Sequence, residues 1–315
     1  MLEARLLRVG REMFLAALGL PLETVESWVI DRLTAILDEQ RVRAGQTLFT
    51  SGESAEFIYF MQNGQVRFGR DGGHSWTFRG RWVLGGFEVL GDRPSSYTAI
   101  ALTDFYAMRV AATPWVELFE DSFQLARSAV VNAARAVAHI EERVPPEAPP
   151  TVPRESPPMR QLPHGSLGLV DRLALLLDVA PLRGAGVQAL ADLAAVSEQC
   201  SFDTGQIVIE RGVRQEQLVR VVEGLILAER ADPKVVRHYR SGDLVCGAAM
   251  IGGAAESWEA RALTPTLGIA IPIEALFDLM EEHFDLVRST MAALGAERER
   301  ILDRLAAESG DVVVS

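Results

Sequence analysis

The chain has 315 residues, a length that suits about two domains of ordinary size. Hydrophobic residues make up 48% of it and charged residues 23%, which is typical of a globular protein with a substantial core. The net charge is -12, so the chain lacks the excess of Lys and Arg that neutralises phosphate backbones, and we expect no nucleic-acid partner.

Two features predict the cellular compartment. Cys200 and Cys246 form no metal-ligand or disulfide motif, which is typical of buried thiols in a reducing environment. The N-terminus shows no cleavage pattern of a secretory signal after Met13–Leu18, and no apolar run reaches the roughly 18 residues of a membrane span. We therefore expect a cytoplasmic protein that does not associate with membranes.

The first half begins with helical signals and continues with short strands. Residues 1–20 are expected to form an N-terminal helical segment, and apolar residues recur at helical spacing over 23–37. Three runs rich in β-branched and aromatic residues follow at 47–49, 57–60 and 65–68, separated by turns that carry glycine. Many short strands of this kind favour a sandwich or a jelly-roll barrel.

A helix with a narrow apolar stripe closes each half of the chain. In the first half the stripe runs from Ala126 to Ile140 in steps of four and three residues. The corresponding stripe of the second half contains Val287, Met291, Leu294, Ile301 and Leu305, with Arg298 in the same row. The stripe either packs on the parent barrel or forms a seam with a partner helix or a second copy. Both interpretations stay open, because Arg298 in the row is an awkward residue for full burial.

A proline-rich segment separates the two halves. Residues 144–165 contain eight prolines, which exclude a helix or a central strand because proline fixes φ and lacks the backbone donor. Such a segment is expected to be an extended spacer. A ligand for a partner with an aromatic groove is the alternative interpretation.

The second half repeats the first. Gly45, Gly52 and Gly64 recur about 160 residues later as Gly205, Gly212 and Gly224, and the runs 207–209, 218–222 and 225–228 repeat the three early strands. The sequence therefore predicts domain 1 at 21–143, the linker at 144–165, domain 2 at 166–308 and a tail at 309–315.

The glycine-punctuated strands of each copy carry a family resemblance. The run Val42–Phe49, followed by Gly52-Glu53, Ile58–Phe60 and Asn63–Val66, resembles the opening strands of cyclic-nucleotide-binding domains, the family of the cyclic-AMP receptor. The resemblance implies a mainly β fold with flanking helices, with two jelly-roll β-barrels of the cyclic-nucleotide-binding type in tandem. It covers about residues 20–143 and 166–305.

The family binds its ligand with a phosphate-binding cassette, Phe-Gly-Glu, a short helix and Pro-Arg-Ala-Ala-Thr. Its glutamate takes the ribose hydroxyl and its arginine pairs with the phosphate. When residues 84–98 are aligned on Pro94, the arginine position holds Ser95 and the glutamate position holds Gly86. The ligand-binding candidates that the resemblance then implies are Gly85, Gly86, Glu88, Arg93, Ser95, Ser96 and Thr98.

The cassette of the second copy departs further from the family. Residues 246–258 contain no arginine, and Glu256 adds a negative charge. A charge-assisted hydrogen bond contributes about 1.5–3 kcal/mol, roughly tenfold or more in affinity, so we expect the second copy not to bind cyclic nucleotides. A cyclic nucleotide in domain 1 remains the one candidate ligand.

Other chemistry is not expected. The five histidines are scattered without metal-ligand spacing, and no nucleophile elbow or phosphate-binding glycine loop appears. We expect neither an enzyme, nor a metal site, nor a helix-turn-helix. Two functions stay open: a regulatory sensor that signals through its terminal helices to a protein partner or a second copy, and a structural adaptor with degenerate barrels.

Overall fold

The computed structural model describes residues 12, 14–15, 18–20, 25–70, 74–144, 166–179, 182–183, 185–231, 235–253, 257–309 and 312–314. Most of the predicted N-terminal helical segment and residues 145–165 of the predicted linker lie outside the described residues. The chain forms two compact units, which are described separately. Unit 1 contains residues 1–133 and 290–315, and unit 2 contains residues 134–289.

Unit 1 is a barrel of two facing sheets. Its strands are β1 (Asp38–Val42), β2 (Thr47–Phe49), β3 (Phe57–Met61), β4 (Gln65–Gly69), β5 (Ser75–Arg79), β6 (Trp82–Leu84), β7 (Thr98–Ala101), β8 (Phe105–Ala111) and β16 (Val312–Val314). One sheet has the order β1-β8-β3-β6 and the other the order β16-β5-β4-β7-β2. The early strands lie where the β-branched and aromatic runs predicted them.

Alternation along the strands builds the core of unit 1. Val66 and Phe68 of β4 point inward and face Phe78 and Trp76 of β5 in register. Side chains of successive strand residues point to opposite faces, so Arg67 between them is exposed. The inner face therefore consists of large aromatic side chains.

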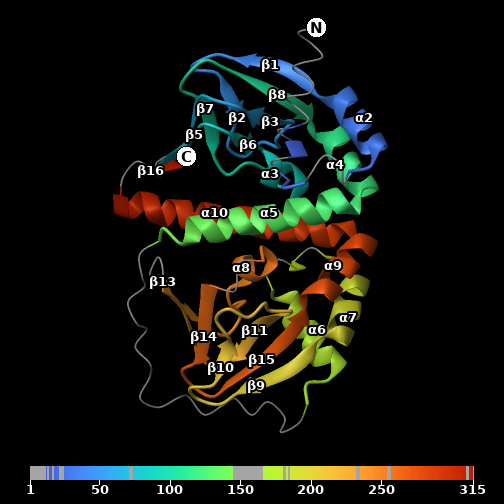
Figure 1. The fold of residues 1–315 in the computed structure, drawn as a ribbon, viewed down its shortest axis with the longest axis vertical. Coiled ribbons are helices and arrows are strands. Elements are labelled where there is room, and N and C mark those ends of the chain that lie inside the picture. Colours follow the sequence, from blue (N-terminus) through green and yellow to red (C-terminus); the bar gives the residue numbers. More distant parts are fainter. Residues whose placement is uncertain are drawn as a thin grey trace. The chain divides into compact units, whose positions relative to one another are not determined.

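Among the described residues, three helices belong wholly and two partly to unit 1. The first four are α2 (Ser27–Ile36), α3 (Gly86–Leu90), α4 (Ala112–Asp121) and the first part of α5 (Phe123–Glu141). A further helix, α10 (Phe284–Ser309), contributes its residues from Thr290 onward. Figure 1 shows this part of α10 running past α3 toward β16.

Unit 2 repeats this topology. Its elements are α6 (Leu169–Leu177), α7 (Val187–Val196), β9 (Glu198–Phe202), β10 (Ile207–Ile209), β11 (Gln217–Glu223), β12 (Ile226–Arg230), β13 (Val235–Tyr239), α8 (Gly247–Ile251), β14 (Trp258–Ala262), β15 (Thr266–Pro272) and α9 (Ile273–Glu282), with the end of α5. Its sheets have the orders β9-β15-β11 and β10-β14-β12-β13. The counterpart of β6 is a single bridge between Arg220 and Leu244.

The end of the chain completes the barrel of unit 1. Residues 309–315 are predicted only to form a tail, whereas Val312–Val314 form β16 and pair in parallel with Trp76–Phe78 of β5. Val312 and Val314 are buried and Val313 is exposed. No local sequence signal predicts this pairing, because the partner strand β5 is more than two hundred residues away in the chain.

The last part of each closing helix lies in a different unit from the one that the repeat predicts. The boundaries predicted from the repeat, 21–143 and 166–308, assign each closing helix to the copy that precedes it. By contact, the end of α10 belongs to the first barrel and the end of α5 to the second. The predicted domain boundaries stay a prediction, because they describe the repeat in the sequence, whereas the two units are defined by contacts between residues in the structure.

Candidate functional site

The first cassette begins at a glycine that no other residue replaces easily. Gly85 precedes α3 with φ +88, in the left-handed region. A Cβ atom there would lie 2.8 Å from the carbonyl oxygen of Phe57 and 3.0 Å from the ring of Phe49. The turn and the crowding together fix where α3 starts, and with it the position of Glu88 one turn later.

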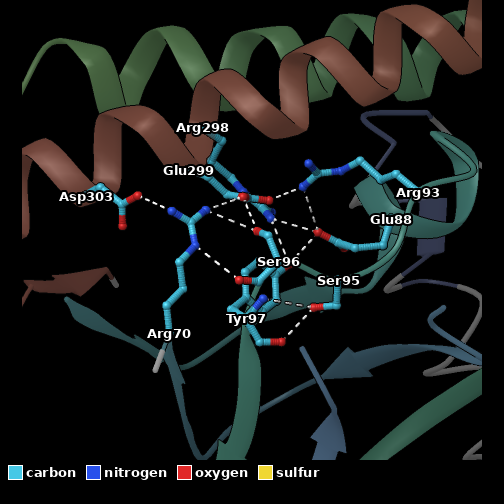
Figure 2. Close-up of polar contacts among 9 residues, drawn as sticks. All are labelled: Arg70, Glu88, Arg93, Ser95, Ser96, Tyr97, Arg298, Glu299 and Asp303. Carbon is cyan, nitrogen blue, oxygen red and sulfur yellow. Dashed lines mark hydrogen bonds and ion pairs between the residues drawn. The ribbon is translucent and has the colours of Figure 1, made fainter. Parts of the chain in front are cut away.

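Glu88 is the buried acid of the cassette, with its side chain 1% exposed. One carboxylate oxygen, Oε1, accepts hydrogen bonds from the hydroxyl of Tyr97, from Arg93 Nη2 at 3.4 Å and from Arg298 Nη2 at 3.3 Å. Arg298 Nη2 also lies 3.1 Å from the hydroxyl oxygen of Tyr97 (Figure 2). A carboxylate removed from water needs such partners, and here one of them comes from α10.

A second acid, Glu299 of α10, lies beside it with its side chain 4% exposed. Its Oε1 accepts from Arg93 Nη2, and its Oε2 accepts from Ser96 Oγ and from Arg70 Nη2 at 2.6 Å. Arg70 also pairs with Asp303, and its Nε donates to the carbonyl oxygen of Ser96 at 3.1 Å (Figure 2). The cassette loop, the end of β4 and α10 are thus joined through one buried carboxylate.

The charges of this cluster balance. Three arginines face three carboxylates, namely Arg70, Arg93, Arg298, Glu88, Glu299 and Asp303. The guanidinium of Arg298 lies 4.2 Å from the centre of the Phe87 ring, a cation–π contact that covers its apolar face.

The cluster also fixes protonation states. Burial, and then the charge of Glu88, raise the pKa of Tyr97 well above its ordinary value, so Tyr97 is a neutral donor at neutral pH. Burial acts to lower the pKa of Arg298, but Tyr97, Glu88 and Glu299 outweigh it and the net shift is upward. Arg298 is therefore a fixed cation.

Small residues let α10 approach the cassette closely. A Cβ atom on Gly91 would lie 2.8 Å from the backbone nitrogen of Ala292, and one on Gly295 would lie 3.1 Å from Phe87 Cβ and 3.2 Å from Arg93 Cζ. These contacts leave no space for a side chain at Gly91, and at Gly295 they admit one only if Phe87 and Arg93 shift by a few tenths of an ångström. The cluster is thus closely packed where α10 meets the cassette, while the side chains of Arg70 and Asp303 at its edge are partly exposed.

The structure brings together only some of the residues that the sequence singled out. The cluster contains Glu88, Arg93 and Ser96. Gly86 is the first residue of α3, which carries Glu88, and Gly85 caps that helix. Ser95 is turned into its own loop, where its hydroxyl donates to the carbonyl oxygen of Tyr97 at 2.7 Å. Thr98 Oγ1 accepts from the backbone N–H of Ser51 at 3.3 Å. Among the described residues, neither of these two hydroxyls bonds to any of the six charged side chains of the cluster.

Five members of the cluster were not predicted as site residues, although the sequence pattern around one of them was unusual. The missed residues are Arg70, Tyr97, Arg298, Glu299 and Asp303. Arg298 interrupts an otherwise apolar stripe, and a buried arginine requires a buried acid. Glu299 shows no such signal, because the residue next to a stripe on an amphipathic helix is ordinarily solvated.

The second cassette lacks this chemistry. The repeat counterpart of Gly85 is Cys246, which adopts φ 49 before α8, and the counterparts of Glu88 and Tyr97 are the buried residues Ala249 and Trp258. Burial raises the pKa of the Cys246 thiol to about 12. Cys246 is thus an uncharged thiol in a strained turn, and α8 offers no buried acid.

One ion pair is common to both units. In unit 1 Arg70, which follows β4, pairs with Asp303 of α10. In unit 2 Arg230, at the end of β12, pairs with Glu142 just after α5. These four residues are repeat counterparts within the alignment of the two copies. The pair between a strand end and a closing helix is therefore part of the shared architecture.

The predicted seam residues are buried in the single chain. None of these side chains is more than 6% exposed; the residues are Val287, Met291, Leu294, Ile301 and Leu305. Contact with a second copy through this stripe would require those side chains to leave their present surroundings. The seam stays a prediction, and the structure favours the packing interpretation that the sequence left open.

Two further properties concern only the described residues. In that part of the chain, no helix combines the length and the apolar character needed to cross a bilayer. Within the same residues, no group of three or more His, Cys, Asp or Glu side chains is placed to hold a metal ion.

A comparison with protein families agrees with the fold of unit 1. Residues 39–122 match the family model of the cyclic nucleotide-binding domain. The predicted fold class is confirmed: the chain is mainly β with flanking helices and contains two jelly-roll barrels of the cyclic-nucleotide-binding type in tandem. No curated protein matches the sequence significantly.

Solved structures with similar chains include two kinase regulatory proteins and one sensor domain. The regulatory domain of Toxoplasma gondii protein kinase A with cAMP is 15% identical, with 97% of each chain covered and a TM-score of 0.32. The regulatory subunit of a cAMP-independent protein kinase A from Trypanosoma cruzi, bound to guanosine, is 12% identical, covering 96% of this chain and 90% of that one, with a TM-score of 0.33.

The third is the sensor domain of the transcriptional regulator DNR from Pseudomonas aeruginosa. It is 16% identical and covers 43% of this chain and 93% of its own, with a TM-score of 0.38. All three TM-scores are low, so these similarities support no inference about function.

Proposed function

We propose that this chain is a non-enzymatic regulatory protein in which the first cassette and helix α10 change state together, and in which a protein partner reads the terminal helices. The observation that carries the proposal is the hydrogen bonding of Arg298, on α10, to Glu88 and Tyr97 of the cassette. Arg298 and Glu88 are both buried, so displacing either one breaks a buried ion pair.

The energetics support coupling. Removing one partner of a buried ion pair costs about 3–5 kcal/mol. A ligand that rearranged Glu88 or Arg93 would therefore also weaken the hold on α10, and a displacement of α10 would weaken the cassette. Such reciprocity is the thermodynamic requirement of a regulatory domain.

A structural adaptor is the second candidate, and a specific observation favours it. Ser95 stands at the arginine position of the cassette, and its hydroxyl is used inside its own loop. The charged residues around it are also partnered within the chain. An adaptor would use the same two barrels for protein contacts without any ligand.

The compartment and the partners belong to this proposal. We place the protein in the cytoplasm, since Cys200 and Cys246 are both free thiols and burial raises their pKa values to about 11 and about 12. The net charge of -12 supports a protein partner over a nucleic acid.

Calorimetric titration with cyclic AMP, cyclic GMP and cyclic dinucleotides separates sensor from adaptor. The sensor proposal predicts heat of binding at ligand concentrations up to millimolar, and a loss of about tenfold or more in affinity in Arg93→Ala, because a charge-assisted hydrogen bond is removed. Arg79→Ala changes an exposed arginine of β5 and serves as the matched control.

Two results would contradict the sensor. The absence of heat and of any thermal shift at millimolar ligand would leave the adaptor. Binding that Arg93→Ala leaves unchanged would show that the ligand site lies elsewhere.

A further inference from the structure

We propose that Glu299 is a built-in anionic ligand of the first cassette, held in an oxyanion-binding site formed by Arg70, Arg93 and Ser96. Free oxyanions of the phosphoryl type compete for the same donors. The inference deepens the proposed function and rests on it for the regulatory meaning of the cassette.

The donors surround the carboxylate of Glu299 from different parts of the chain. Arg93 Nη2 donates to Oε1, while Ser96 Oγ and Arg70 Nη2 donate to Oε2. Two guanidinium groups and a hydroxyl around one pair of oxygens is the donor set that recognises phosphate as well as carboxylate. With the carboxylate 4% exposed, these interactions are little screened by water.

The donors hold their places by contacts that do not involve Glu299. Arg70 is fixed by its bonds to the carbonyl oxygen of Ser96, at 3.1 Å, and to Asp303. Arg93 contacts Glu88 at 3.4 Å, and its backbone N–H donates to the carbonyl oxygen of Glu88 at 3.0 Å. The site would therefore persist in large part if the carboxylate left it.

The site also has unused donor capacity. The Nε atom of Arg93 is buried, and it has no hydrogen-bond partner among the described residues. An anion with three acceptor oxygens could use more donors than the two oxygens of a carboxylate. This Nε atom lies 3.2 Å from the Cβ position of Gly295 on α10, so an anion could reach it only if that packing changed.

The second copy shows that the architecture does not require this arrangement. The shared pair, Arg70 with Asp303, recurs in unit 2 as Arg230 with Glu142. The repeat counterpart of Glu299 is Ala138, which is buried and carries no charge. A barrel of this type therefore closes without the carboxylate, and Glu299 serves the anion site of the first copy.

The test is rescue by a free anion in the full-length chain. Glu299→Ala vacates the site, and thermal unfolding is then followed in sodium phosphate and in sodium chloride at equal ionic strength. We expect phosphate at tens of millimolar to raise the melting temperature of Glu299→Ala by about 2–4 °C over chloride, and that of the unaltered chain by less than about 1 °C.

Two variants control for charge and for the site. Glu297→Ala removes a partly exposed carboxylate of the same helix, paired with Arg300, and should behave like the unaltered chain. Glu299→Ala combined with Arg93→Ala should lose the response to phosphate. If Glu299→Ala folds only in phosphate, that dependence is itself the expected result, and Glu299→Gln then supplies the comparison in chloride.

A parallel arm with cyclic AMP and cyclic GMP identifies the source of the phosphoryl group. A response of Glu299→Ala to phosphate alone supports the anion site while the nucleotide sensor fails. A response to cyclic nucleotides at lower concentration supports both. The proposal is overturned if neither Glu299 variant is stabilised by phosphate over chloride, or if Glu297→Ala responds as strongly.

Discussion

At the scale of single residues, Arg298 shows how a local anomaly marks a site. It stands in the apolar stripe of α10, where a charged side chain is expected only if buried acids meet it. Glu88 and the hydroxyl of Tyr97 accept its hydrogen bonds, and Phe87 covers its face. The arginine therefore joins the helix to the cassette through charge and through packing.

A double-mutant cycle tests this joint. Arg298→Met removes the cation and keeps a side chain of similar length, and we expect it to lower the free energy of unfolding by about 3 kcal/mol because Glu88 loses a buried partner. In Arg298→Met with Glu88→Gln the loss should be smaller than the sum of the single losses by about 1 kcal/mol or more. Urea unfolding measures all four proteins.

The matched control is Arg300→Met, which alters an arginine with its side chain 63% exposed on the same helix. It should change the free energy of unfolding by less than about 0.5 kcal/mol. Strictly additive losses in the cycle would contradict a direct interaction between Arg298 and Glu88.

The residues of the candidate site were only partly predictable from the sequence. Glu88, Arg93 and Ser96 lie close to the cassette glycines, so a family resemblance leads to them directly. Glu299 is 206 residues from Arg93, and Arg70 is 229 residues from Glu299. Their approach depends on which closing helix folds onto which barrel, and no pattern within either segment encodes that choice.

At the scale of elements, α10 depends on small residues where it crosses α3. A Cβ atom on Gly91 would lie 2.6 Å from the carbonyl oxygen of Phe87 and 2.8 Å from the backbone nitrogen of Ala292. Both obstacles are backbone atoms, which cannot turn away as a flexible side chain can. The helix and the cassette must therefore move apart if Gly91 acquires a side chain.

Gly91→Ala tests the packing of α10 on α3. We expect it to lower the free energy of unfolding by about 1–3 kcal/mol, because an overpacked contact forces the backbone to shift. Gly69→Ala is the comparison, since a Cβ atom there would lie 3.6 Å from Ser75 Cβ, an ordinary contact. Equal urea midpoints for Gly91→Ala and the unaltered chain would contradict the close approach.

At the scale of the whole molecule, the internal repeat predicted the architecture well. Glycine turns and alternating strands depend on short-range physics, so the same barrel could be read twice along the chain. The repeat could not show that the last part of α10 joins the first barrel, or that β16 extends its sheet. Both features arise from contacts between distant segments, after the copies have diverged.

The divergence leaves the buried polar groups of the cassette in one copy. Unit 1 has a buried acid, a phenol and arginines around its cassette, whereas unit 2 has Ala249 and Trp258 at the corresponding positions. We interpret unit 2 as the part that kept the scaffold, and unit 1 as the part whose cassette is linked to α10.

Hydrogen exchange followed by mass spectrometry tests the central claim, that the first cassette and α10 respond as one. Glu88→Gln removes the cassette charge without changing α10. The account predicts faster exchange in peptides from residues 290–309, and unchanged exchange in peptides from β12 and β13 of unit 2. Exchange of residues 290–309 at the rate of the unaltered chain would contradict it.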